Sequence, residues 1–220
     1  MSFARLAIAI ACCVVAASAQ AQSYPNRPIR LIVPWPPGQA TDIATRVVGE
    51  RIAQALGQPL VVDNRAGASG QIGTEAVAKS APDGYTLLAA SSGPISINPL
   101  LSKLPYDVET QLAPIANIGI IPFVLVVPAS LPANTMQEFL QLARASPGKF
   151  SFASSGAGAT AHLIAEAFNI GANIQAVHVP YRGSSPSITD LIAGQVQVMF
   201  DNLPTCAEHV KSGKLRGLAV

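Results

Sequence analysis

The sequence predicts an α/β protein with two lobes, each a mainly parallel sheet flanked by helices. Short apolar runs alternate with stretches of helical periodicity along most of the chain, which is the pattern of βα units. A long apolar passage at residues 115–127, broken by Gly119 and Pro122, divides these units into two sets of similar size, as expected of a crossing between lobes. A hydrophobic content of 50% is ample for a folded core.

The first βα unit opens the pattern. Residues 29–33 form a β-prone apolar run, and the proline-rich turn at 34–37 must end it because proline lacks the amide that a strand ladder needs. Thr41 or Asp42 can then cap a helix. Apolar residues at helical spacing extend this helix to Gly57, which ends it.

The remaining strands are expected at apolar runs and the remaining helices at amphipathic stretches that follow loops of small residues. In the first lobe we expect a strand at 60–62, a helix at 73–79, a strand at 85–90 and a short helical segment at 97–101. In the second lobe we expect helices at 136–145, 160–168, 186–193 and 206–211, and strands at 150–153, 174–178 and 196–200. We therefore place lobe 1 at 22–117, lobe 2 at 118–214, and the start of a strand returning to lobe 1 at 215–220.

The N-terminus has the form of an export signal. Arg5 supplies a positive start, residues 6–17 are apolar but short for a membrane span, and the AQA sequence at 19–21 fits the cleavage rule. We expect cleavage near Ala21 and a periplasmic location. A retained anchor is the alternative.

The cysteines predict no disulfide. Lipidation at Cys12 or Cys13 is disfavoured because no convincing lipobox precedes either residue. Cleavage leaves only Cys206, and a lone thiol of this kind is more often a packing residue than a nucleophile.

The charge pattern excludes some partners. The formal net charge is +2, and the 12% of charged residues form no basic run. Nucleic acid and anionic membrane surfaces are therefore poor candidate partners.

The turn before the first helix is a candidate anion site. The first amides of a helix lack intrahelical partners and lie at the positive end of the helix dipole, so they can hold a carboxylate without lysine or arginine. An ordinary βα connection that binds nothing is the alternative.

Two further loops have small residues that let a ligand or another backbone come close. The loop at 64–73 lacks the lysine of a phosphate-binding loop, so it is either a tight turn or a ligand contact. The loop at 152–162 contains GAGATA, but no acidic residue follows at the spacing of a dinucleotide site. Its hydroxyls and helix-start amides favour hydrogen bonding to a ligand.

Individual side chains leave several alternatives open. Ser155 lacks a GxSxG elbow, although an exported α/β hydrolase using Ser155 with His162 or His178 remains the alternative function. His162 and Glu166 have i,i+4 spacing, but a third metal ligand is missing, so we expect no metal and no cofactor. Asp201 follows a strand and either binds the ligand or caps the helix near Thr205.

Several segments together resemble the tripartite tricarboxylate transporter substrate-binding receptors, also called the Bug family. The segments are YPNRPIRLIVPWPPGQATDIATR, VVDNRAGASGQIGTEAVAKSAPDGYTLL, FASSGAGATAHLIAEAF, HVPYRGSSPSITDLIAGQVQVMFDNLP and GKLRGLAV. The resemblance implies a two-lobed periplasmic receptor of the type II binding-protein fold. Such receptors close on a small organic carboxylate and deliver it to membrane permease subunits without chemistry, so we expect no enzyme and a monomer.

The resemblance also implies the ligand-binding residues. They are Pro37, Gly38, Gln39, Ala40, Thr41, Asp42, Ser91, Ser92, Ser154, Ser155, Gly156, Gly158, Thr160 and Asp201. The family usually has two glycines where this chain has Gly38 and Gln39, so the longer side chain is expected to narrow the pocket or contact the ligand. Family members continue for roughly a hundred residues beyond position 220, so we expect lobe 1 to be incomplete and the chain to be truncated at its C-terminus.

Overall fold

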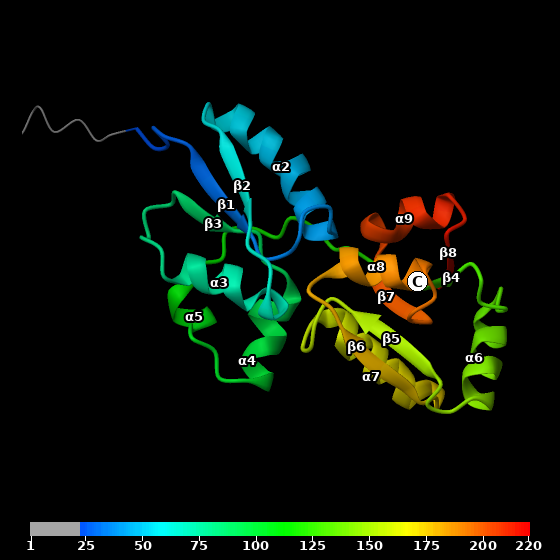
Figure 1. Ribbon diagram of the computed structural model, residues 1–220. Helices are drawn as coiled ribbons and strands as arrows, with labels where there is room; N and C mark the ends of the chain where they lie inside the picture. Colours follow the sequence, from blue (N-terminus) through cyan, green and yellow to red (C-terminus); the bar gives the residue numbers. More distant parts are fainter. Residues whose placement is uncertain (1–22) are drawn as a thin grey trace, which may run out of the picture.

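The computed structural model describes residues 23–220, and the expected signal at 1–21 lies outside the described residues. Two sheets and their helices form two lobes (Figure 1). Their elements, in chain order, are β1 (Ile29–Val33), α2 (Ala40–Leu56), β2 (Leu60–Asn64), η1 (Ala68–Gly70), α3 (Gln71–Ala78), β3 (Thr86–Leu88), η2 (Gly93–Ile97), α4 (Asn98–Leu101), α5 (Val108–Gln111), β4 (Phe123–Pro128), α6 (Met136–Ala145), β5 (Phe150–Ser154), α7 (Thr160–Ala172), β6 (Ala176–Pro180), α8 (Ser184–Ile192), β7 (Val198–Asn202), α9 (Leu203–Lys211) and β8 (Leu215–Ala219).

The sheet of lobe 1 has the order β2-β1-β3, with all its strands parallel. Its central strand β1 is buried because α2 packs on one part of the sheet and α3 on another. The sequence predicts this lobe well where burial is strong. The sequence does not predict the short helix α5, which depends on local capping. Asp107 caps α5 by accepting from the amides of Glu109 and Thr110.

The sheet of lobe 2 has the order β6-β5-β7-β4-β8. β5, β6 and β7 are parallel, whereas β4 runs antiparallel to both β7 and β8. The expected mainly parallel α/β architecture is therefore confirmed, with an antiparallel portion at β4 and β8. Among residues 23–220 no helix combines the length and apolar character needed to cross a membrane.

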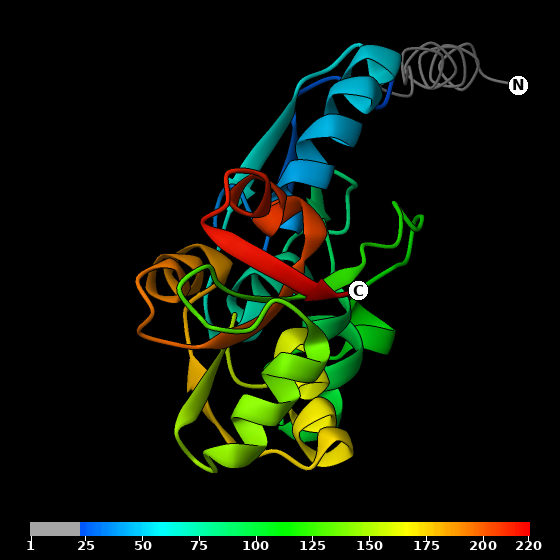
Figure 2. The same cartoon turned by 90° about the vertical axis from the view of Figure 1, so that its right-hand side faces the viewer.

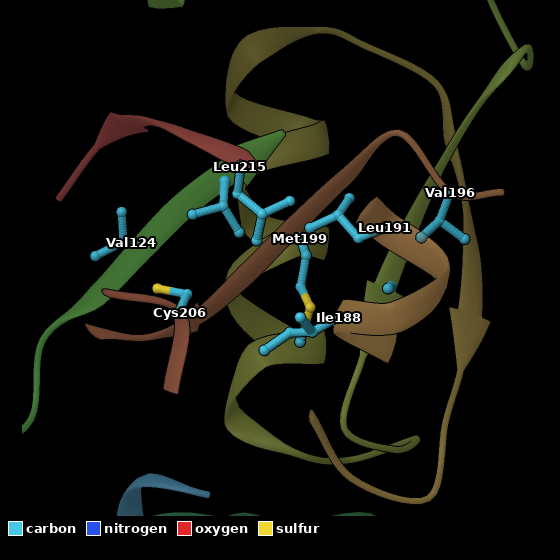
Figure 3. Close-up of a cluster of buried hydrophobic side chains, with 9 residues drawn as sticks. Val124, Ile188, Leu191, Val196, Met199, Cys206 and Leu215 are labelled. Atoms are coloured by element: carbon cyan, nitrogen blue, oxygen red, sulfur yellow. The ribbon is translucent and has the colours of Figure 1, made fainter. Parts of the chain in front are cut away.

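Two apolar cores cover the two faces of this second sheet. On one face Val124, Met199 and Leu215 pack with α8 and with Cys206 of α9 (Figure 3). On the other face Phe152 and Val198 pack with α6 and α7. Because alternate residues of a strand point to opposite faces, β7 contributes Met199 to the first core and Val198 to the second.

Two expectations for the crossing need correction. The long strand at 115–127 is present only from Phe123 onward, and residues 112–122 form no strand. Ile115 and Ile120 are exposed, at 79% and 92%, and no strand of the described residues pairs with this stretch, so β-propensity alone does not order it. The segment expected to begin a return to lobe 1 is β8, which pairs with β4 and so belongs to the sheet of lobe 2 up to residue 219.

Candidate ligand site between the lobes

The turn after β1 folds back onto the first turn of α2. The helix begins at Ala40, with Gln39 at its N-cap and no side-chain cap, so neither Thr41 nor Asp42 caps it as expected. Asp42 instead lies in the first turn and folds back, because its Oδ2 accepts from the Gly38 amide at 2.9 Å. This contact closes the loop from within lobe 1.

Asp42 is held as a buried anion. Burial would raise the pKa of Asp42, but hydrogen bonds from Arg46, Gly38 and Asn64 outweigh burial and keep that pKa below its usual value. The side chain is only 2% exposed and its oxygens are shared among these donors. Asp42 therefore shapes the loop and is not presented to the gap between the lobes.

Residues of this loop meet lobe 2 directly. The Ala40 amide donates to Thr205 Oγ1 of α9 at 3.0 Å, and the Ser184 amide at the start of α8 donates to Gln39 Oε1 at 3.4 Å. Figures 1 and 2 show the start of α2 beside α9. The Ala40 amide, a helix-start amide expected to face an anion, is thus paired across the lobes, and Gln39, at 3% exposure, accepts from the Ser184 amide.

The loop between β5 and α7 belongs to lobe 2 and packs against lobe 1. Gly156 and Gly158 have φ of +141° and +78°, and a Cβ at these positions would lie 2.6 Å from Ser69 Oγ and 2.8 Å from Asn98 Oδ1. Glycine is therefore required both by conformation and by the close approach of lobe 1. Ser69 Oγ donates to the Ala157 carbonyl of this loop, which links the two lobes.

The serines after β3 have separate roles. Ser91 Oγ accepts from Trp35 Nε1 at 2.9 Å and so supports the first loop within lobe 1. Ser92 Oγ lies 2.7 Å from Thr160 Oγ1 at the start of α7, which is another contact between the lobes. The structure thus brings the three expected loops together at the junction, where contacts across the lobes involve Gln39, Ala40, Ser92, Ala157 and Thr160.

A cavity of about 310 Å³ lies between the lobes. Lobe 1 lines it with Gly67, Ala68, Ser69 and Gln71, and lobe 2 lines it with Gly156, Ala157, Pro180, Tyr181 and Arg182. Of the expected ligand residues only Gly156 lines this cavity. The loop at 64–73 was recognised as a possible contact, whereas Tyr181 and Arg182 were missed, although their place at the C-terminal end of β6 is the signal that drew attention to Asp201.

Tyr181 and Arg182 give the cavity its polar wall. The Tyr181 hydroxyl donates to Asp190 Oδ2 at 2.7 Å, and burial together with this carboxylate raises the pKa of Tyr181 to about 12. Arg182 is exposed, and it takes part in none of the ion pairs found among residues 23–220. The wall therefore contains the neutral, hydrogen-bonded phenol of Tyr181 and the guanidinium of Arg182, which can bind an anion.

Asp201 lies away from the cavity wall, on the α8 face of β7. Its Oδ1 accepts from Ser184 Oγ at 2.8 Å, and its Oδ2 has no hydrogen-bond partner within the described part of the chain. Burial raises the pKa of Asp201 to about 7, although hydrogen bonds from Ser184 and Asn202 oppose the rise. Asp201 does not cap α9, which begins at Leu203 after Asn202.

The contacts of Ser154 and Ser155 do not assemble a hydrolase. Ser154 is fully buried and its Oγ lies 2.7 Å from His178 Nε2, so the histidine contacts Ser154 and not Ser155. The second histidine, His162 on α7, accepts from the Gly158 amide. Nor do residues 23–220 contain three His, Cys, Asp or Glu side chains gathered as a metal site would need.

Comparisons with known proteins agree on one family. Residues 44–220 match the family described as "Tripartite tricarboxylate transporter family receptor". The chain is 42% identical to "Protein BugT" of Bordetella pertussis over 217 residues, which are 98% of this chain and 67% of that protein.

Solved structures give the same result. One, described as a periplasmic transporter, has a TM-score of 0.87 at 41% identity, over 90% of this chain and 66% of its own. Another, R. palustris Rpa4515 with adipate, has a TM-score of 0.87 at 35% identity, over 89% and 66%. The chain therefore spans about two thirds of the length of the proteins it matches.

Proposed function

Because the chain belongs to the tripartite tricarboxylate transporter receptor family, we propose that it works in the periplasm as a solute-binding receptor. In this role it captures a small carboxylate between its lobes and presents it to the membrane permease subunits of such a transporter. It acts as a monomer and performs no chemistry on the ligand.

The observation that carries this proposal is the cavity between facing loops of the two lobes. Its walls combine small residues, which let main chain approach a ligand, with the Tyr181–Arg182 segment at the end of β6. A cavity of this kind between lobes is a frequent place for small molecules. Rpa4515, a structure with the same fold, is described with adipate.

The geometry supports closure as the binding event. Four hydrogen bonds already link the lobes, through Ala40, Gln39, Ser69 and Ser92. All four involve uncharged groups, which break and reform at low cost because water can replace either partner. Closure then removes the ligand from bulk water while Arg182 offsets its charge.

The presence of Arg182 changes the expectation drawn from the sequence. The sequence predicts recognition by main-chain amides with no cation, but the Ala40 amide at the start of α2 is paired across the lobes and an arginine lines the cavity. The proposal therefore assigns carboxylate recognition to small-residue loops together with one guanidinium.

Titration calorimetry tests the proposal with three six-carbon compounds. Adipate carries two carboxylates, hexanoate carries one and adipamide carries none. We expect one adipate per chain, weaker hexanoate, no adipamide, and full recovery of each compound unchanged. If none of a broad panel of organic acids binds, or if the protein consumes one of them, the receptor assignment is wrong.

A further inference from the structure

Three aromatic rings are stacked beneath the loop that joins β5 to α7. The ring of His178 on β6 lies between Phe152 of β5 and His162 of α7, with ring centroids 4.8 Å and 3.9 Å away and planes inclined by 17° in both pairs. The stack lies on the α7 face of the sheet, where Phe152 belongs to the apolar core. The ligand site assigned above makes no use of either histidine.

Each histidine makes a hydrogen bond to one end of this loop. The Gly158 amide donates to His162 Nδ1 at 3.2 Å. At the other end His178 Nε2 lies 2.7 Å from Ser154 Oγ, which also accepts from the Gly156 amide at 3.2 Å. The two rings thus tie down the segment whose Gly156 and Ala157 line the cavity and whose Thr160 meets lobe 1.

These contacts require a neutral His162. To accept from Gly158, Nδ1 must carry no proton, so the ring proton is on Nε2, which lies 3.6 Å from Glu166 Oε1. His178 is also neutral, because burial and the neighbouring His162 lower the pKa of His178 to about 4. Two cations at a ring separation of 3.9 Å would repel each other strongly.

We propose that His162 and His178 are positioning residues that hold the β5–α7 loop in its ligand-binding conformation without touching the ligand. The inference rests on the proposed function for its effect on affinity. Its effect on the loop itself does not depend on that function. Because Gly156 and Gly158 give the loop much conformational freedom, the two histidine contacts restrict a segment that would otherwise pay for its order when ligand binds.

Two substitutions of His162 by amide side chains distinguish the effect of the hydrogen-bond acceptor from the effect of the imidazole ring. In H162N the short side chain places Oδ1 near the position of Nδ1, whereas in H162Q the longer side chain reaches past it and leaves the Gly158 amide without an acceptor. The corresponding pair at the other histidine is H178Q, which reaches the position of Nε2, and H178N, which does not. H209N replaces the third histidine of the chain, on α9, and is the control.

Adipate affinity and amide exchange at Gly158 give two independent readings. We expect H162Q to bind adipate about fivefold to tenfold more weakly than H162N, because one hydrogen bond to a loop is lost. Gly158 should exchange faster in H162Q than in H162N without ligand. H209N should match the wild type in both adipate affinity and Gly158 exchange.

The outcomes are distinguishable. Equal affinity and equal Gly158 exchange in H162N and H162Q would overturn the proposal, whether both resemble the wild type or both fail. If the wild type binds none of the panel of organic acids, the proposed function fails, yet Gly158 exchange in the ligand-free variants still decides whether His162 holds the loop.

Discussion

In lobe 2, burial shifts the pKa values of two side chains, the buried Asp201 and the half-buried His178, in opposite directions. Burial raises the pKa of Asp201 from 3.8 to about 7, so between pH 4 and 7 the folded chain keeps a proton that the unfolded chain releases, and stability falls as the pH rises. Burial and His162 lower the pKa of His178 from 6.5 to about 4, so the unfolded chain takes up a proton and stability falls as the pH falls. In the wild type the two effects oppose each other.

Single substitutions should separate the contributions of Asp201 and His178 to the pH dependence of stability. When the pH is lowered from 6.5 to 4.5, the change in unfolding free energy should be about 1–2 kcal/mol less favourable in D201N than in the wild type. In H178Q the same change should be more favourable than in the wild type by a similar amount. Urea unfolding followed by circular dichroism at several pH values measures both slopes. E50Q, at an exposed position of α2, should follow the wild type. Parallel profiles for all four proteins would contradict the opposed titration.

The other shifted acids do not enter this window. Their pKa values lie below the usual range, so the stability they supply is present above about pH 4 and is lost only in stronger acid. These acids are Asp42, Asp63, Asp107 and Glu208.

Arg182 should distinguish ligands with one carboxylate from ligands with two. We expect R182Q to weaken adipate binding about tenfold, the effect of losing one charged hydrogen bond, and to change hexanoate binding little. Calorimetry with both acids measures the difference. R51Q, which removes an exposed arginine of α2, is the matched control. Equal losses for adipate and hexanoate would show that Arg182 does not select the second carboxylate.

At single positions the sequence predicts which loops matter better than it predicts which side chains face the cavity. Gly156 is expected at the site from its glycine-rich strand end and lines the cavity, where its φ of +141° and the close approach of Ser69 require glycine. Asp42 and Ser154 were also expected, but both turn into their own lobe, where partners distant in sequence, Asn64 and His178, hold them. Such partners cannot be identified from local spacing.

The turn between β6 and α8 has no room for a side chain against lobe 1. Gly183 has φ of +112°, and a Cβ there would lie 2.4 Å from Pro36 Cγ of lobe 1. The next residue, Ser184, gives its amide to Gln39. A single methyl group added at this turn would therefore clash with the first loop and push it away from α8.

Substitution of this glycine should separate the lobes. We expect G183A to raise the radius of gyration in X-ray scattering and to weaken adipate binding. The comparison is G194A, where φ is +75° and no atom lies within 4 Å of the added Cβ, so that backbone strain of about 1–2 kcal/mol arises without a clash. An identical radius for G183A and the wild type would show that the first loop yields to the methyl group.

The elements themselves were predicted most accurately where the pattern alone decides. β1 and α6 have the expected bounds, β1 because a buried run meets prolines, and α6 because Thr135 caps it by accepting from the Glu138 amide. β6, α8 and β7 lie about two residues from their expected places. Their ends are set by register against neighbouring strands, which no single run of residues encodes.

Across the whole molecule, one tryptophan reports on the junction. Trp35 is the only tryptophan of the chain and is 5% exposed. It lies in the apolar cluster of lobe 1, to which lobe 2 contributes Ala159. Separation of the lobes removes that cover from the indole.

Tryptophan emission should therefore follow closure. We expect G183A to emit at longer wavelength than the wild type, and adipate to shift its emission back, because closure returns the indole to an apolar environment. Fluorescence titration measures both shifts, and hexanoate should produce a smaller one. Emission that stays constant through saturation with adipate would mean that binding leaves the junction around Trp35 unchanged.

The two-lobed plan was predictable because two sets of βα units flank an interrupted apolar passage. The path between the lobes was not predictable from the sequence. Ile115 and Ile120 are residues typical of strands, but no strand of the described residues lies beside them to pair with. For the same reason β8 could be expected as a strand, while its partner β4 became clear only from the assembled sheet.

The thiol of Cys206 has a practical consequence for handling the protein. It is fully buried in the core of lobe 2, where burial, with the charge of Asp201, raises its pKa to about 11. A sulfur that neither ionises nor meets solvent reacts slowly with oxidants and alkylating reagents. Within residues 22–220, cysteines introduced on the surface of each lobe would react with maleimide dyes well before Cys206, so distances between the lobes become measurable without first deleting that thiol.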